Sequence, residues 1–327
     1  MGKKIFFIGI ALIFINNIAK GQDPQFTQFF ASPMYLSPSF AGSTKGKRVT
    51  LNYRDQWPAL PKSFVTYAFS YDHFIHTINS GLGVQFLREQ AGAGNLSTTN
   101  LGLLYAYHIK LNHEWRIIPA LGFYYTQQQL QFHKLTFGNE LLNENPTRTE
   151  PRPREFVWDV DASASGLLLS EQYWVGLTID HLLLPNQSLT GEESLLPIKY
   201  SLFGGMRIPI GSRYNRRSFE SIFPAFHFRK QGLNYQMNLG VYWHKQPFML
   251  GFWYRGIPVF RNYPSNDAIA ILLGYSTEQF SFGYSYDVTV SELAGLSEGA
   301  HEISVIFKFG EYQTPREKWK MNPCPGL

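Results

Sequence analysis

The sequence predicts an all-β fold, a transmembrane antiparallel β-barrel of about 14 strands with short periplasmic turns and longer extracellular loops. Three observations favour this fold: apolar and polar residues alternate along most of the chain, an export signal precedes them, and the composition is aromatic but poor in charge. Aromatic residues make up 16% of the chain and charged residues 16%, whereas about 25% of residues are charged in ordinary soluble domains. A lipid-facing band between aromatic girdles, around a polar lumen, would give this composition.

Residues 1–21 have the features of a cleavable signal peptide. Lys3 and Lys4 form a basic start, residues 5–15 are apolar, and Ala19-Lys20-Gly21 offers small residues at a cleavage site. The apolar run is shorter than the ~20 residues that a membrane-spanning helix needs. We therefore expect the mature chain to begin at Gln22, and the lack of a cysteine at the cleavage site predicts that it is not a lipoprotein.

The charge balance indicates an ordinary mixed surface. The chain has 29 Lys and Arg against 24 Asp and Glu, and without the three lysines of the signal peptide 26 remain against 24, a net charge of +2. This balance favours no nucleic-acid partner. The single cysteine, Cys324, has no second cysteine with which to form an internal disulfide.

The strands are predicted from alternation, because successive side chains of a strand point to opposite faces of the sheet. In residues 248–255, for example, Phe248, Leu250 and Phe252 oppose Gly251 and Trp253. The same pattern predicts strands at residues 47–54, 62–72, 80–89, 97–109, 114–127, 156–168, 172–182, 198–207, 219–229, 233–243, 247–255, 268–276, 279–287 and 301–309.

The connections between these strands sort by length. If the first strand starts at the periplasm, the odd-numbered connections lie outside the cell, and they include the long stretches 128–155, 183–197 and 288–300. The even-numbered connections are short turns, apart from residues 208–218. Outer-membrane barrels show this sorting, so it supports the strand count.

An even number of strands also places both chain ends on the periplasmic side. The predicted organisation is a signal peptide at residues 1–21, a periplasmic lead-in rich in proline and aromatics at 22–46, the outer-membrane barrel at 47–309 and a periplasmic tail at 310–327. We expect the protein in the bacterial outer membrane, among its lipids.

Candidate catalytic and metal-binding groups have simpler explanations. His301 and Glu302 open the last strand, but no nucleophile accompanies them, so Glu302 is expected to face the lumen. Asp159 and Asp161 share a strand face, a spacing that can suit a metal, but lumenal carboxylates paired with arginines such as Arg255 or Arg207 are favoured. The sequence therefore predicts no enzyme, no metal site and no cofactor.

The lead-in contains the candidate partner-binding residues Pro33, Tyr35, Pro38 and Gly42. A proline-rich segment does not extend a sheet easily, because proline lacks the backbone donor. Its aromatic side chains would be unfavourable in water. Three arrangements remain open for docking: against the periplasmic rim, in the lumen as a plug, or on a partner. Cys324, near the basic tail, is a fifth candidate contact, with a disordered end as the alternative.

Two sets of motifs resemble a known family. The predicted mature start reads Gln22-Asp23-Pro24-Gln25-Phe26 and leads into Ser32-Pro33-Met34-Tyr35-Leu36-Ser37-Pro38-Ser39-Phe40-Ala41-Gly42. Near the other end, Tyr286-Asp287 is followed by Gly299-Ala300-His301-Glu302-Ile303-Ser304, and Cys324-Pro325 lies close to the terminus. This order of motifs resembles the PorP/SprF family of type IX secretion and gliding-motility outer-membrane proteins, although serine replaces the family's usual asparagine at Ser32 and Ser37.

The resemblance implies a non-enzymatic barrel that takes part in protein secretion at the cell surface. Its implied partners are type IX secretion and motility proteins in the periplasm, and a large secreted surface protein or adhesin. No small-molecule substrate is implied. The main alternative is a passive porin or small-solute channel, since a porin shares every feature of the barrel. An outer-membrane hydrolase and a soluble β-sandwich are less well supported.

Overall fold

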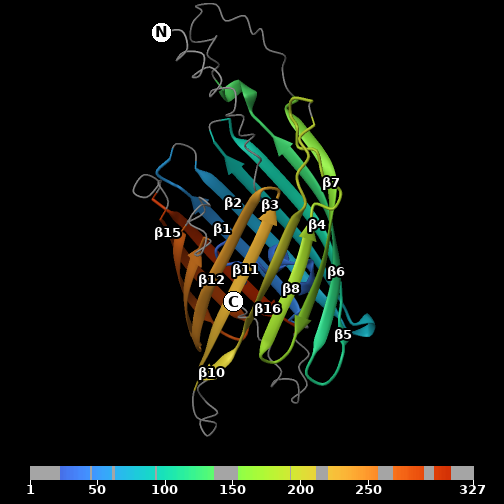
Figure 1. The fold of residues 1–327 in the computed structure, drawn as a ribbon, viewed down its shortest axis with the longest axis vertical. Coiled ribbons are helices and arrows are strands. Elements are labelled where there is room, and N and C mark those ends of the chain that lie inside the picture. Colours follow the sequence, from blue (N-terminus) through green and yellow to red (C-terminus); the bar gives the residue numbers. More distant parts are fainter. Residues whose placement is uncertain are drawn as a thin grey trace, which may run out of the picture.

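A computed structural model of the chain describes residues 23–44, 46–60, 63–92, 94–135, 154–191, 193–210, 220–256, 268–290 and 298–310. Its 16 strands form one antiparallel sheet that closes on itself through pairing of β1 with β16 (Figure 1). Two of the strands, β5 (Ile109–Lys110) and β10 (Ile208–Ile210), are short flanking pieces, so 14 strands form the wall, as predicted. These are β1 (Lys47–Gln56), β2 (Phe64–Ile75), β3 (Ser80–Ala91), β4 (Leu96–Tyr107), β6 (Arg116–Gln129), β7 (Phe156–Leu169), β8 (Tyr173–Asp180), β9 (Lys199–Met206), β11 (Glu220–Gln231), β12 (Asn234–Lys245), β13 (Phe248–Arg255), β14 (Ala268–Ser276), β15 (Phe280–Thr289) and β16 (Ala300–Phe309).

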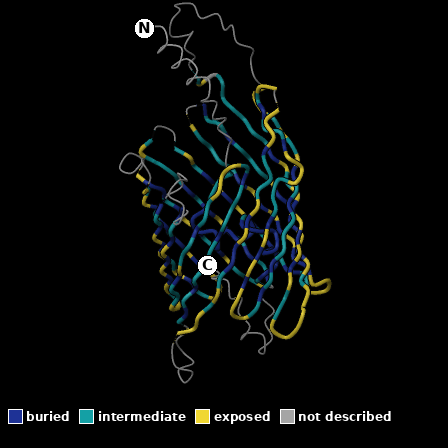
Figure 2. The backbone as a smooth tube through the Cα atoms, in the orientation of Figure 1, coloured by how far each residue is buried: buried dark blue, intermediate teal, exposed yellow. Residues whose placement is uncertain are grey.

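The predicted alternation is confirmed strand by strand. On β13, Phe248, Leu250 and Phe252 are exposed on the outer face, whereas Met249 and Trp253 are buried inside. Figure 2 shows buried and exposed residues alternating along many of the strands, most clearly in the lower part of the wall. The outer face thus offers hydrocarbon to lipid, while all backbone groups of the wall can pair within the closed sheet.

The long and short connections lie at opposite ends of the barrel. Residues 130–135, 154–155, 181–191 and 193–198, the described parts of two long connections, lie at one end, and short turns such as residues 170–172 and 277–279 lie at the other (Figure 1). By the loop-length rule the first end is extracellular and the second is periplasmic. We call them the outer and the inner end. The long inner connection falls mostly on residues 211–219, outside the described part.

Residues 23–44 run through the lumen from the outer to the inner end, and we call this segment the plug. It contains α2 (Pro33–Leu36) and the 3₁₀ turn η1 (Pro38–Phe40), the latter packed on β4, β6 and β7. Among the described residues, no helix has the length and apolar character needed to cross a bilayer. The expectation of a periplasmic lead-in is therefore corrected for residues 23–44, which adopt the lumenal arrangement, one of the three left open by the sequence.

The direction of the plug corrects a second expectation. Asp23 lies beside His181 and Lys199 at the outer end, and the chain then descends to β1, which begins at the inner end. The first described residue is thus at the opposite end from the periplasm. An even number of strands determines only at which end of the barrel the wall begins and ends. It does not determine the position of a segment that precedes the wall and folds back into the lumen. The signal peptide and the tail from 311 onward lie outside the described residues.

The plug leaves the lumen where two glycines let backbones approach closely. A Cβ atom at Gly81 of β3 would lie 2.0 Å from the carbonyl oxygen of Ala41, and Gly42 has a φ of 67°, in the left-handed region. Only glycine meets both requirements at low cost. The inner end of the plug is therefore held against the wall by local backbone geometry.

A valine at Gly81 should displace the plug from the wall and destabilise the barrel by about 1–3 kcal/mol, the usual cost of overpacking. The measurement is the unfolding temperature of the purified protein in detergent. Gly166→Val is the matched control, because a Cβ at Gly166 meets no atom within 4 Å. Equal unfolding temperatures for the two variants would contradict the close approach.

Candidate functional site

The lumen is the candidate functional site, because wall and plug meet there through buried charges. Arg54 of β1 lies 2.8 Å from Asp287 of β15 and 3.0 Å from Glu302 of β16. The three side chains are 2%, 3% and 0% exposed, respectively. Such charges are tolerated only when they are paired and hydrogen-bonded.

The plug supplies the missing hydrogen bonds of this charged cluster. The backbone N–H groups of Thr27 and Gln28 donate to the two carboxylate oxygens of Glu302, at 2.7 and 3.0 Å. The Thr27 hydroxyl donates to Asp287 at 2.6 Å and accepts from Arg54 and Arg255. We call this cluster the latch, since it joins β1, β13, β15 and β16 to the plug.

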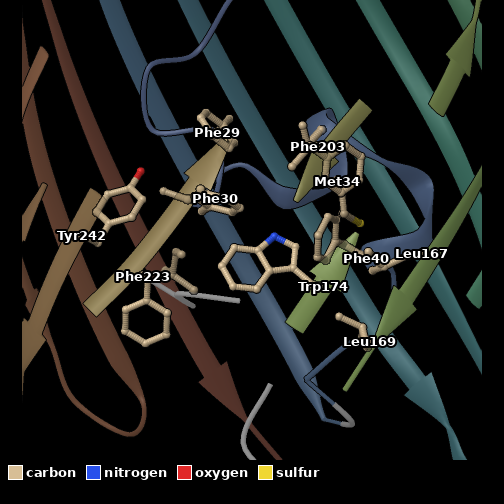
Figure 3. Close-up of a cluster of buried hydrophobic side chains, with 14 of the residues drawn as sticks. Phe29, Phe30, Met34, Phe40, Leu167, Leu169, Trp174, Phe203, Phe223 and Tyr242 are labelled. Carbon is tan, nitrogen blue, oxygen red and sulfur yellow. The ribbon is translucent and has the colours of Figure 1, made fainter. Parts of the chain in front are cut away.

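An aromatic layer lies next to the latch. Phe29 packs edge-on against Trp253, with ring centroids 4.7 Å apart, and Phe30 packs in the same way against Trp174 at 5.6 Å. Phe30 lies between Trp174 and Tyr242 (Figure 3). Trp174 and Trp253, 2% and 3% exposed, therefore help to fill the lumen.

Glycines of the wall make room for these rings. A Cβ at Gly240 would lie 2.1 Å from the ring of Trp253, and one at Gly205 would lie 2.4 Å from Trp174. Large side chains thus lie over small ones on the neighbouring strand, as in a well-packed core. The lumen at this height is packed with side chains.

A second ion pair fixes the inner end of the plug. The guanidinium group of Arg48 on β1 donates to Asp72 of β2 at 2.8 Å and to the carbonyl oxygen of Phe40 at 3.0 Å. Asp72 also accepts from the backbone N–H of Gly42 at 2.8 Å. Here too, an ion pair of the wall forms hydrogen bonds with one backbone donor and one backbone acceptor of the plug.

A third polar group lies at the outer mouth, around Asp23. Its carboxylate lies 2.9 Å from Nε2 of His181 and 2.5 Å from Nζ of Lys199, and Nδ1 of His181 lies 2.6 Å from Asp161. Burial raises the pKa of the Asp23 carboxyl, but the charges of Lys199 and His181 outweigh burial and hold that pKa well below its usual range. Burial lowers the pKa of His181, but the charge of Asp23 and the hydrogen bonds to Asp161 and Asp23 raise it to about 9.

The structure places four of the five predicted partner-binding residues in the plug. Pro33, Pro38 and Gly42 are buried in the lumen, and Tyr35 is half-buried there, packed on Phe26 at 5.5 Å. Cys324 lies outside the described residues. Contact of these residues with a partner stays a prediction.

The other candidate residues have structural partners. His301 and Glu302 point to opposite faces of β16, with Nδ1 of His301 near the Tyr284 hydroxyl, so they do not form a pair. Asp161 contacts His181 and Asp159 accepts from the backbone N–H of Asn186, so the expected arginine partners are wrong. The described part holds no group of three or more His, Cys, Asp or Glu side chains arranged for a metal ion.

The sequence placed Glu302, Arg255 and Asp161 in the lumen, but it did not single out Arg54, Asp287 and Lys199, which complete the latch and the mouth cluster. Arg54, Asp287 and Lys199 occupy lumen-facing positions near the outer ends of their strands. Charges on the inward face of a predicted membrane strand are the signal that identifies such residues, because they require partners. What the sequence lacks is the identity of those partners, which come from strands and loops far apart in the chain.

These features define a class of protein: an outer-membrane β-barrel with a lumen filled by its own N-terminal segment. A family comparison then identifies the lineage. The sequence profile described as "Type IX secretion system membrane protein PorP/SprF" matches residues 18–307, and the chain belongs to this family. The predicted family, and with it the outer-membrane location and membership of the type IX secretion system, are thereby confirmed.

Three of the solved structures that are similar to this chain cover most of it at low sequence identity. The Acinetobacter baumannii outer membrane protein Omp33 is 7% identical, with 80% of this chain and 96% of that chain covered and a TM-score of 0.43. The KdgM porin is 9% identical, with 80% and 99% covered and a TM-score of 0.39. The CymD monoaromatic hydrocarbon channel is 12% identical, with 86% and 94% covered and a TM-score of 0.43. No curated protein matches the chain.

Replacing Arg54 by alanine should destabilise the protein by about 3–5 kcal/mol, because two buried carboxylates lose their counter-charge. The change in the free energy of unfolding, measured in urea after reconstitution, checks this value. Arg154→Ala is the control, since Arg154 is exposed. Adding Asp287→Asn and Glu302→Gln to Arg54→Met should recover much of the loss, and no recovery would contradict the electrostatic cause.

Raising the pH should loosen the mouth cluster. The pKa of His181 in the folded protein, about 9, exceeds its ordinary value of about 6.5. Protonated His181 therefore stabilises the folded protein fully below about pH 6.5, and this stabilisation is lost as the pH rises through about 9. A spin label at Gln25→Cys, in a Cys324→Ser background, should become more mobile across that range. The transition should be absent in His181→Gln, and a transition that persists there would rule out His181 as its origin.

Proposed function

We propose that this secretion-system barrel acts as a docking platform and not as a solute pore. The observation that carries this proposal is the plug, which occupies the lumen and is bound to the wall at the outer mouth, at the latch and at the inner end. A barrel closed in this way still provides a rigid frame in the membrane. Its two rims then remain for contacts with other proteins.

The outer rim suits a secreted surface protein or adhesin. The hairpin of β6 and β7 has 14 residues in each strand, the longest in the wall, and the connection between them spans residues 130–155. Long extracellular connections commonly carry binding functions in proteins, because a rigid scaffold positions them. We propose that this rim holds the surface protein.

The inner rim suits secretion and motility components in the periplasm. The contact predicted there is the tail from residue 310, including Cys324. The candidates Pro33, Tyr35, Pro38 and Gly42 act indirectly in this proposal, by shaping the plug that keeps the barrel rigid. We propose no catalytic step.

Crosslinking of the tagged protein in native outer membranes, followed by purification and mass spectrometry, tests the docking function. We expect a large secreted surface protein, or periplasmic secretion and motility components, crosslinked to the barrel. A tagged barrel of an unrelated outer-membrane protein from the same cells is the control. Recovery of the barrel alone would contradict docking.

The porin alternative has one observation in its favour. Free volume remains beside the plug: a vestibule of about 490 Å³ at the outer end and a cavity of about 140 Å³ near Tyr35 and Gln85. If the plug closes the barrel, the full chain should show no steady conductance in planar bilayers. Steady conductance of the full chain would favour the porin.

A further inference from the structure

The outer vestibule contains a carboxylate without a counter-charge. Glu89 belongs to a row of lumen-facing residues on neighbouring strands, listed from β16 to β6 as Glu302, Arg54, Thr66, Glu89, Thr98 and Gln128. In this row Glu302 is paired with Arg54, whereas Glu89 accepts a long hydrogen bond of 3.4 Å from the Thr66 hydroxyl. No ion pair joins Glu89 to a basic side chain within the described ranges.

Two further residues with acceptor groups, Gln128 and Asp287, line the same vestibule. The Oε1 atom of Gln128 and the Oδ1 atom of Asp287 are buried and have no hydrogen-bond partner in the described part. Asp287 as a whole is 2% exposed. Gln128, Asp287 and Glu89 all line a space of about 490 Å³ at the outer end of the plug, within the range of about 300–1,000 Å³ typical of ligand pockets.

The two arginines of the vestibule do not balance its carboxylates. Arg54 is committed to Asp287 and Glu302, and Arg255 contacts Asp287 and the Thr27 hydroxyl. Asp23 is matched by Lys199 and His181. A partly buried carboxylate gains most from a guest that brings both a positive charge and hydrogen-bond donors.

We propose that the outer vestibule is a binding site for a basic side chain, arginine or lysine, of the surface protein held at the outer rim, with Glu89 as its counter-charge. Gln128 and Asp287 accept further hydrogen bonds from the guest. The identity of the guest, a side chain of the surface protein, rests on the proposed docking function. The binding of a basic group by Glu89 can be measured on the purified barrel alone.

A small probe tests the site without any partner. N-acetyl-arginine amide should bind the full-length protein in nanodiscs, measured by calorimetry, and the neutral isostere N-acetyl-citrulline amide should bind at least about tenfold more weakly, as expected for one charge-assisted hydrogen bond. Glu89→Gln should weaken arginine amide binding by a similar factor. Glu171→Gln, at an exposed inner turn, is the control and should bind as the unchanged protein does.

The same variants distinguish this site from the docking function. In cells, Glu89→Gln and the charge-reversed Glu89→Lys should lower the crosslinking yield of the surface protein, whereas Glu171→Gln should not. Equal binding of arginine and citrulline amides, or binding insensitive to Glu89→Gln, would overturn the site and leave docking untouched. Glu89-dependent probe binding with an unchanged crosslinking yield would overturn its role in holding a partner. An unchanged unfolding temperature of Glu89→Gln excludes misfolding as the cause of any loss.

Discussion

The structure of this barrel depends on one electrostatic constraint: a charged side chain that is removed from water needs an opposite charge inside the protein. Glu302 and Asp287 require a cation, and Arg54 supplies it from the strand that closes the wall. The remaining lone pairs of Glu302 accept from the backbone of Thr27 and Gln28. Wall and plug are therefore each incomplete alone, and the lumen is filled because the charges of the wall need donors that its own strands do not offer.

Steric fit extends the same complementarity to the apolar part of the lumen. Phe29 and Phe30 meet Trp253 and Trp174, and wall glycines such as Gly240 leave the space that those indoles need. A porin keeps its lumen open to water, whereas these side chains exclude it at mid-height. The filled lumen therefore supports the proposed docking function over a solute pore.

The sequence predicted the wall far better than its contents, for a physical reason. Period-two alternation is a local property, so the strands around Phe248 and Phe280 could be found from neighbouring residues alone. The latch joins Thr27 to Asp287 across 260 positions, and no local pattern encodes such a pairing. Asp161 illustrates the error: it was expected to pair with an arginine of the barrel, but a histidine in the next loop lies closer. The lumenal position of Pro33 and Pro38 was one of three open arrangements. Composition shows that an aromatic segment must be buried, but it does not show which surface buries it.

The position of the latch has a consequence for the order of assembly. Arg54 lies on the first strand of the wall and Glu302 on the last, and these two strands are the pair that closes the cylinder. The segment that ties them together starts at the outer end and leaves the lumen at the inner end, so placing it inside before the two strands meet avoids threading a chain end through a closed barrel. The barrel is therefore expected to fold around its own N-terminal chain, so that insertion of the plug and closure of the wall form a single cooperative step.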